Sequence, residues 1–280
     1  MTVLANVPIL DVFQYNLVDN IFSFTVAAMG AAAFFLYNSR SQVAPRFRPA
    51  LLVSGLVVSI ACYHYFMIRH SWQDAYEFAA GKYAPTGKSF NDFYRYADWI
   101  LTVPLLMVEL VAVLGLTKAV SRPLLGKLVI AAALMIGLGY PGEVISTPDR
   151  WTERVIWGAL SCIPFFYILY VLWVELTKSL DTQPEQAKKL IGMARMVILI
   201  TWSFYPIAYA LGGTTAALTA KAGGGGDANY VVALQIGYAL ADITAKAGFG
   251  ILIYFIARAK TDALTESGEL VDGVPVAALA

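Results

Sequence analysis

Lys246 and Asp242 lie four residues apart, on one helical face, within the apolar stretch 230–257, which contains no other charged residue. A lysine near the centre of a bilayer costs several kcal/mol, so it is rare without a partner and a role. Its neutral amine can condense with an aldehyde to form a Schiff base, and Asp242 could balance the charge of the protonated imine. The alternative is an ion-paired lysine that only holds helices together. We favour the functional interpretation.

The composition is that of a membrane protein. Apolar residues make up 59% and charged residues 14% of the 280 residues, whereas soluble domains carry about 25% charge. Seven apolar windows come close to or exceed the roughly 17–25 residues that span a bilayer as a helix. They are residues 21–37, 50–68, 96–116, 124–140, 155–174, 196–211 and 230–257.

These windows predict an all-α membrane protein with a single seven-helix bundle at residues 15–260. Residues 1–14 would form an extracellular N-terminal segment, and residues 261–280 a polar cytoplasmic tail that frays. With the N-terminus outside, twelve Lys and Arg residues fall on the inner side and six on the outer side. This asymmetry favours an extracellular N-terminus and a cytoplasmic C-terminus.

The predicted third helix carries two carboxylates at different depths. Asp98 and Glu109 are eleven residues apart, which returns to nearly the same helical face after a rise of about 16 Å. Asp98 would lie in the outer half of the membrane and Glu109 in the inner half, with Lys246 between them in depth. This arrangement suits a proton relay: Asp98 and Asp242 would share the counter-charge of an imine, and Glu109 would deliver a proton from the inner side.

Three further polar residues accompany this pair. Arg95 could hold charge and water on the exit side of Asp98, or its guanidinium could simply extend to the outer interface. His64 on the second helix could bond a carboxylate, or be a structural histidine. Thr102 could bond the Asp98 carboxylate, or its own helix backbone. Glu109 itself has an alternative role, as a helix-packing acid bonded to a hydroxyl.

Aromatic residues fall inside several of the predicted spans. Such residues usually form interfacial belts, but within the spans they could wall a flat, conjugated ligand. Pro206 would kink the sixth helix toward that cavity. The aromatic set is Tyr96, Trp99, Trp157, Trp202, Tyr205 and Tyr209.

With these residues placed, the chain resembles the microbial rhodopsins over roughly residues 15–260. Residues 95–104, Arg-Tyr-Ala-Asp-Trp-Ile-Leu-Thr-Val-Pro, are similar to the third-helix signature of the proton pumps. Residues 202–206, Trp-Ser-Phe-Tyr-Pro, resemble the sixth-helix wall of the retinal pocket. Residues 242–246, Asp-Ile-Thr-Ala-Lys, resemble the seventh-helix retinal-attachment motif.

The resemblance implies a role for each ionisable residue. Lys246 would bind all-trans retinal covalently as a Schiff base, Asp98 would be the primary proton acceptor, Asp242 the second counter-ion and Glu109 the cytoplasmic proton donor. The triplet Asp98, Thr102 and Glu109 resembles that of bacterial outward proton pumps. His64, between two tyrosines, resembles the histidine that pairs with the proton acceptor in the xanthorhodopsin and proteorhodopsin branch.

The resemblance also extends to the cofactor pocket. Leu106, Met135 and Gly139 would join the aromatic residues around retinal. In the xanthorhodopsin branch, a glycine at the position of Gly158 opens a window beside the retinal ring, where a carotenoid can lie as a light-harvesting antenna. The alternative is that Gly158 only allows close helix packing. The family commonly assembles as pentamers or trimers, and a bacterial inner membrane is the implied location.

We therefore expect a light-driven outward proton pump. A sensory rhodopsin that signals through a partner protein is the alternative, but a sensor has no need of the fast reprotonation that an acid at 109 supports. A third possibility is a pigment-free transporter that uses Lys246 and the carboxylates as ligands. No enzyme activity, metal site or nucleic-acid partner is expected; the two cysteines, Cys62 and Cys162, are interpreted as buried thiols.

Overall fold

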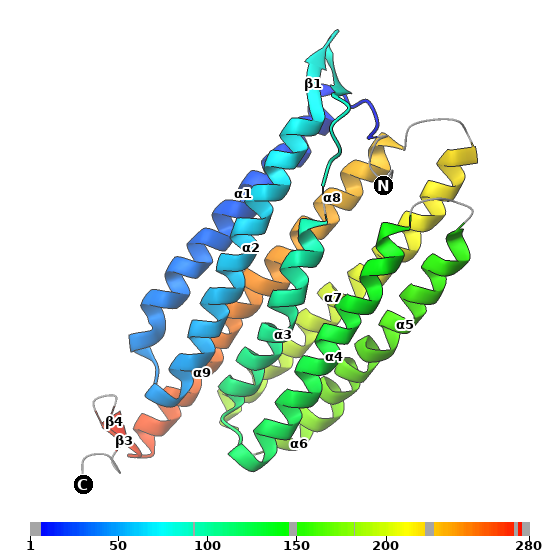
Figure 1. Cartoon of the computed structure of the whole chain (residues 1–280). Coiled ribbons are helices and arrows are strands. Elements are labelled where there is room, and N and C mark those ends of the chain that lie inside the picture. The colour runs from blue at the N-terminus through cyan, green and yellow to red at the C-terminus, as the bar shows by residue number, and fades with distance from the viewer. Residues whose placement is uncertain are drawn as a thin grey trace.

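Seven long helices form a single bundle in the computed structural model of the chain (Figure 1). The structure describes residues 7–91, 93–145, 150–181, 183–221, 227–271 and 274–275, so part of the predicted N-terminal segment and of the C-terminal tail lies outside the described residues. All seven helices are long and apolar enough to cross a membrane. The predicted seven-helix membrane fold is confirmed.

Most of the helices are longer than the apolar windows that predicted them, whereas α3 and α5 equal their windows in length. The first six spans are built on α1 (Val12–Asn38), α2 (Arg48–Ala75), α3 (Tyr94–Leu114), α4 (Lys118–Val144), α5 (Trp151–Tyr170) and α7 (Glu185–Lys221). The seventh consists of α8 (Ala228–Asp242), a π-helical segment η5 (Ile243–Gly248) and α9 (Phe249–Glu266). Helix α9 therefore continues into the stretch that the sequence assigned to the tail.

Short elements connect these helices. The 3₁₀ turns η1 (Ser39–Gln42) and η2 (Pro45–Phe47) join α1 to α2. A π-helical segment η4 (Val171–Glu175) and the short helix α6 (Leu176–Leu180) follow α5. Strands β3 (Leu270–Val271) and β4 (Val274–Pro275) pair after α9.

The apolar windows did not predict the hairpin between α2 and α3. Strand β1 (Tyr76–Ala79) pairs antiparallel with β2 (Lys82–Pro85), and Gly81 adopts a φ of 78° at the turn. The ring of Tyr83 stacks on that of Tyr15 in α1, with centroids 3.6 Å apart. These contacts fasten the hairpin to the end of the bundle that carries the N-terminus, here called the N-terminal face (Figure 1). The opposite end is the C-terminal face.

Local signals explain where the helices begin and end. Asp11 and Gln14 form a capping box at the start of α1, and the Asp227 side chain accepts from the Asn229 amide at the start of α8. Helix α3 ends at Gly115, whose φ of 64° is a left-handed conformation that glycine adopts without strain. The end of α3 is therefore encoded locally.

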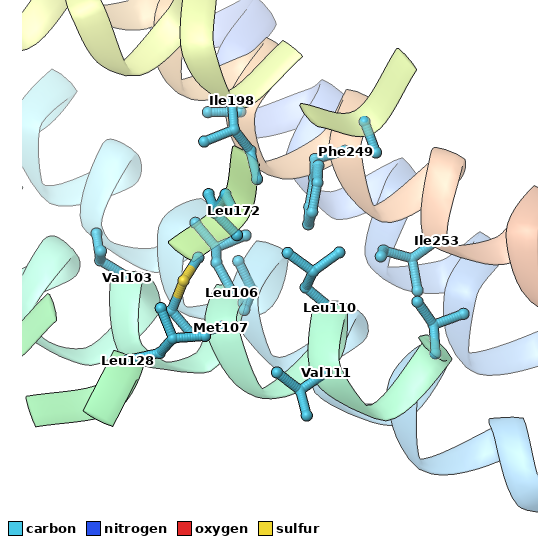
Figure 2. Close-up of a cluster of buried hydrophobic side chains, with 14 of the residues drawn as sticks. Val103, Leu106, Met107, Leu110, Val111, Leu128, Leu172, Ile198, Phe249 and Ile253 are labelled. Carbon is cyan, nitrogen blue, oxygen red and sulfur yellow. The ribbon is translucent and has the colours of Figure 1, made fainter. Parts of the chain in front are cut away.

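A large apolar core fills the half of the bundle nearer the C-terminal face. Figure 2 shows side chains from α3, α4, α7 and α9 converging there, with Leu172 of η4 among them. Leu106 and Leu110 lie on this face of α3, and Phe249 and Ile253 approach from α9. This core surrounds the turns of α3 that carry Glu109, so that carboxyl group is placed in apolar surroundings.

Candidate functional site

Lys246 lies between two carboxylates in the middle of the bundle. Its Nζ is 2.7 Å from Asp98 Oδ2 and 2.7 Å from Asp242 Oδ1. Only 2% of the lysine and 1% of Asp98 are exposed. The lysine belongs to η5, where the backbone widens into a π-helix, a distortion that often marks functional sites. The structure thus brings together the three residues that the sequence singled out.

Asp242 has the larger number of hydrogen-bond donors. Besides Lys246, its Oδ1 accepts from the Tyr205 hydroxyl at 2.6 Å and from the Trp99 indole at 3.2 Å. Its Oδ2 accepts from the Tyr65 hydroxyl at 2.7 Å. These donors come from α2, α3 and α7, so the carboxylate links four helices through fixed contacts.

Asp98 has far fewer contacts. Among the described residues, Lys246 is its near partner, and His64 Nδ1 lies 3.8 Å from its Oδ1. The Thr102 hydroxyl does not reach this carboxylate; it donates to the Asp98 backbone carbonyl at 2.9 Å. Among the described residues, the buried Asp98 carboxylate therefore has fewer side-chain donors than that of Asp242.

His64 bonds its own helix in this structure. Its Nδ1 donates to the Ile60 carbonyl at 3.0 Å, as a structural histidine would, and lies 3.8 Å from Asp98 Oδ1, too far for a hydrogen bond. The bond between His64 and Asp98 stays a prediction.

Arg95 does not extend to the outer interface. It is 2% exposed, and its Nη2 donates to Gln235 Oε1 at 2.5 Å. The guanidinium also lies over the Tyr238 ring, 4.8 Å from its centroid. The alternative of an extended surface arginine is therefore wrong. Sequence reasoning missed Gln235, although a glutamine inside an apolar window was a usable signal.

Glu109 is separate from the lysine cluster. It is 0% exposed, and neither carboxyl oxygen has a hydrogen bond of good geometry among the described residues. Ser54 of α2 is its polar neighbour, but that hydroxyl donates to the Ala50 carbonyl at 3.1 Å. The Ser54 hydroxyl is nevertheless close to the carboxyl group, so the donor role and the alternative of a packing acid bonded to a hydroxyl both stay predictions.

A cavity of about 330 Å³ begins at Lys246 and Asp242 and runs between α3, α4, α5 and α7. Its walls are mostly apolar and aromatic. Ten of the predicted pocket residues line it: Tyr96, Trp99, Leu106, Met135, Gly139, Gly158, Trp202, Tyr205, Pro206 and Tyr209. The long apolar shape that ends at a nucleophilic amine fits a conjugated aldehyde such as retinal.

Trp157 does not line this cavity. Its Cβ would lie 2.9 Å from a Cβ placed at Gly142, so the indole belongs to the contact between α4 and α5. Its neighbour Gly158 does face the cavity, and the space beside it holds the Tyr209 ring: a Cβ at 158 would lie 2.6 Å from Tyr209 Cε1.

The sequence reasoning also missed an arginine at the far end of the cavity. Arg154 is buried, and its Nη2 donates to the Tyr209 carbonyl at 3.0 Å and to Glu143 Oε2 at 2.9 Å. In return, the Tyr209 hydroxyl donates to the Arg154 carbonyl at 2.7 Å. These reciprocal bonds hold the Tyr209 ring beside Gly158.

Comparisons with known proteins show the family of this chain. The family described as "Bacteriorhodopsin-like protein" matches residues 16–260. The green-light absorbing proteorhodopsin of Gamma-proteobacterium EBAC31A08 is 30% identical over 89% of this chain and 88% of its own length. The blue-light absorbing proteorhodopsin of Gamma-proteobacterium Hot 75m4 is 31% identical over 84% of both chains.

Two solved structures are more similar. The crystal structure of thermophilic rhodopsin is 51% identical, with a TM-score of 0.85 over 94% of this chain and 99% of the other. Xanthorhodopsin, described as a light-driven ion pump with dual chromophore, is 49% identical with the same TM-score and the same coverage.

Proposed function

Because this chain belongs to the bacteriorhodopsin-like family, in the xanthorhodopsin and proteorhodopsin branch of the microbial rhodopsins, we propose that it is a light-driven outward proton pump with retinal bound to Lys246. It is a multi-pass protein of a bacterial plasma membrane. The observation that carries the proposal is the position of Lys246 between two carboxylates with unequal numbers of hydrogen-bond donors.

The chain's own residues supply the proton path. Bound retinal would supply the absorption of visible light and a change of geometry at the Lys246 nitrogen. Asp98, which has fewer side-chain donors among the described residues, takes the proton from that nitrogen, while Asp242 stays in place through its bonds to Tyr65, Tyr205 and Trp99. Glu109 returns a proton from the other side.

The direction of transport rests on which side of the cluster each acid occupies. Asp98 lies on α3 toward the N-terminal face and Glu109 toward the C-terminal face. The excess of Lys and Arg on the C-terminal side supports a cytoplasmic C-terminus. Protons would then enter at Glu109 and leave past Asp98 and Arg95. An acid in the Glu109 position also favours a pump over a sensor.

The test is a pH electrode in a suspension of cells that make the protein and are supplied with retinal. Illumination should acidify the medium, and a protonophore should abolish the signal. Cells that make the chain but receive no retinal are the control. A light signal that grows with protonophore would mean that another ion moves. A purified protein without a visible band that hydroxylamine bleaches would remove retinal from the proposal.

We further propose that the cavity edge at Gly158 admits a carotenoid antenna, by analogy with the dual chromophore of xanthorhodopsin. A polyene is long, rigid and apolar enough to lie in such an opening. The Tyr209 ring beside Gly158 would form one wall of it. Fluorescence excitation spectra with added carotenoid test this: a carotenoid-shaped band should appear in the wild type and disappear in Gly158→Trp. A homo-oligomer, pentamer or trimer, is the assembly we propose.

A further inference from the structure

A buried lysine that the proposed pump does not use lies near the C-terminal face. Lys260 of α9 is 6% exposed. Its ammonium donates to the backbone carbonyls of Val113 at 3.1 Å and Leu114 at 2.6 Å, the last two residues of α3. The final carbonyls of a helix have no partner within it and carry the negative end of the helix dipole. The α3 terminus thus compensates the buried charge.

The other neighbours of this ammonium offer little compensation. Its Nζ lies 5.0 Å from the centroid of the Phe47 ring, and Arg46 places a like charge nearby. No carboxylate among the described residues pairs with it. A buried cation without such a partner depends on its hydrogen-bond acceptors. If the end of α3 moved away, the ammonium would lose both carbonyl acceptors and would bind water instead. The contact between Lys260 and α3 therefore has two states, formed and broken.

Near Lys260, α9 contacts both the end of α3 and the connection between α1 and α2. Thr261, next in sequence, accepts from the Ala44 amide at 2.9 Å and so ties the α1–α2 connection to α9. Gly115 follows Leu114, and a Cβ there would lie 3.4 Å from Lys260 Nζ. The ammonium therefore packs directly against the left-handed residue that ends α3.

The same end of α3 follows Glu109 along the helix, toward the C-terminal face. Val113 and Leu114 are four and five residues beyond Glu109, a rise of about 6–7.5 Å along the helix. Glu109 is 0% exposed and surrounded by the apolar core. The end of α3 that Lys260 contacts therefore lies between Glu109 and the C-terminal face.

We propose that Lys260 is a positioning residue that holds the end of α3 closed against α9, and that release of its two hydrogen bonds admits the proton that refills Glu109. This inference rests on the proposed pump, in which Glu109 is the donor. It concerns the uptake of a proton from the C-terminal side. The transfer from Glu109 to the Lys246 nitrogen precedes it and does not need the contact to open.

Three variants of the full chain, each purified with retinal, test the proposal. Lys260→Met removes the ammonium, Lys260→Arg keeps a cation with several donors, and Lys118→Met removes a charge from an exposed position just after the same helix end. After a flash, recovery of absorbance reports the proton on the Lys246 nitrogen, and a soluble pH dye reports uptake from the medium.

In Lys260→Met, dye-detected uptake should become about fivefold faster, which corresponds to about 1 kcal/mol. Reprotonation of the Lys246 nitrogen should stay within about twofold, since that step precedes opening. Lys260→Arg and Lys118→Met should behave like the wild type. A purely structural role would lower the stability of the pigment and leave the ratio of the two rates unchanged.

Unchanged uptake in a folded Lys260→Met pigment would overturn the inference. If that variant does not fold, hydrogen exchange in the wild type serves instead. Steady illumination should raise amide exchange in peptides covering residues 109–116, and equal exchange in light and darkness would overturn the proposal. Failure of the wild type to acidify its medium would instead contradict the pump itself, so the two failures are distinguishable.

Discussion

The two halves of α3 carry the same chemical group in opposite surroundings. Toward the N-terminal face, Asp98 shares a lysine with Asp242, and tyrosine and tryptophan donors hold Asp242 in place. Toward the C-terminal face, Glu109 has no hydrogen bond of good geometry among the described residues and is enclosed by apolar side chains. Asp98 therefore lies beside a cation and Glu109 in apolar surroundings, and we propose that the first accepts a proton and the second supplies one.

One helix thus carries both acids that we propose to serve successive proton transfers in the same outward direction. The difference does not come from the carboxyl groups, which are nearly the same acid in water. It comes from the neighbouring helices, which supply a cation and donors at one level and leucine and phenylalanine at the other. Single substitutions can remove one element of this asymmetry at a time.

Asp98→Asn should have the largest effect. It removes the proposed proton acceptor from the half of α3 near the N-terminal face, here called the polar half. An amide cannot take the proton, so light-driven acidification should fall at least about a hundredfold. The pigment should still form, because Asp242 remains to balance Lys246. The pH electrode gives the transport rate and the visible spectrum gives the amount of pigment. Wild-type acidification in a fully coloured variant would assign the acceptor role elsewhere.

Glu109→Gln removes the acid from the half of α3 near the C-terminal face, here called the apolar half. The Lys246 nitrogen should then recover its proton about 10–100-fold more slowly, because an amide delivers none. Recovery should also slow as the pH of the medium rises, since the proton now comes directly from water. Flash photolysis over a pH series measures this. Glu185→Gln, at an exposed residue outside the apolar core, is the matched control. A photocycle equal to that of the wild type would exclude Glu109 as the donor.

Tyr65→Phe and Tyr205→Phe each remove one hydrogen-bond donor from Asp242, and we expect them to lower the free energy of unfolding by unequal amounts. Tyr65 is the donor to Asp242 Oδ2, so its loss leaves a buried carboxylate oxygen without a hydrogen bond. That loss should cost about 1.5–3 kcal/mol of unfolding free energy. Tyr205 donates to Oδ1, which retains Lys246 and Trp99. Its loss should therefore cost less, about 1 kcal/mol. Unfolding in denaturant, followed by loss of colour, compares them; equal costs would contradict the asymmetry.

Ser54→Ala tests whether proton donation by Glu109 needs the hydroxyl of its polar neighbour. The Ser54 hydroxyl already donates to the Ala50 carbonyl, within its own helix. We therefore expect reprotonation of the Lys246 nitrogen to change by less than about twofold. The same flash experiment measures this. A tenfold slower recovery would mean that the hydroxyl turns to Glu109 during the cycle.

Much of the site could be predicted from residue type and spacing. Lys246 and Asp242, four residues apart in an apolar stretch, form the ion pair that this spacing predicts. Asp98 and Glu109 lie at different depths, as eleven residues of helix require. Other members depended on contacts between distant segments. Tyr65, Gln235 and Arg154 each act through a partner on another helix, and nothing in the neighbouring sequence indicates that partner.

The sequence by itself determined the seven spans, the buried lysine and the depths of the acids, because helix periodicity and the cost of charge in a bilayer act locally. Only the tertiary structure decided which of the two aspartates has more donors among the described residues, that Arg95 binds Gln235, and that Tyr209 occupies the space beside Gly158. It also placed Lys260 against the end of α3. These outcomes depend on how the helices pack, since a hydrogen bond across helices exists only once both partners have been brought within about 3 Å.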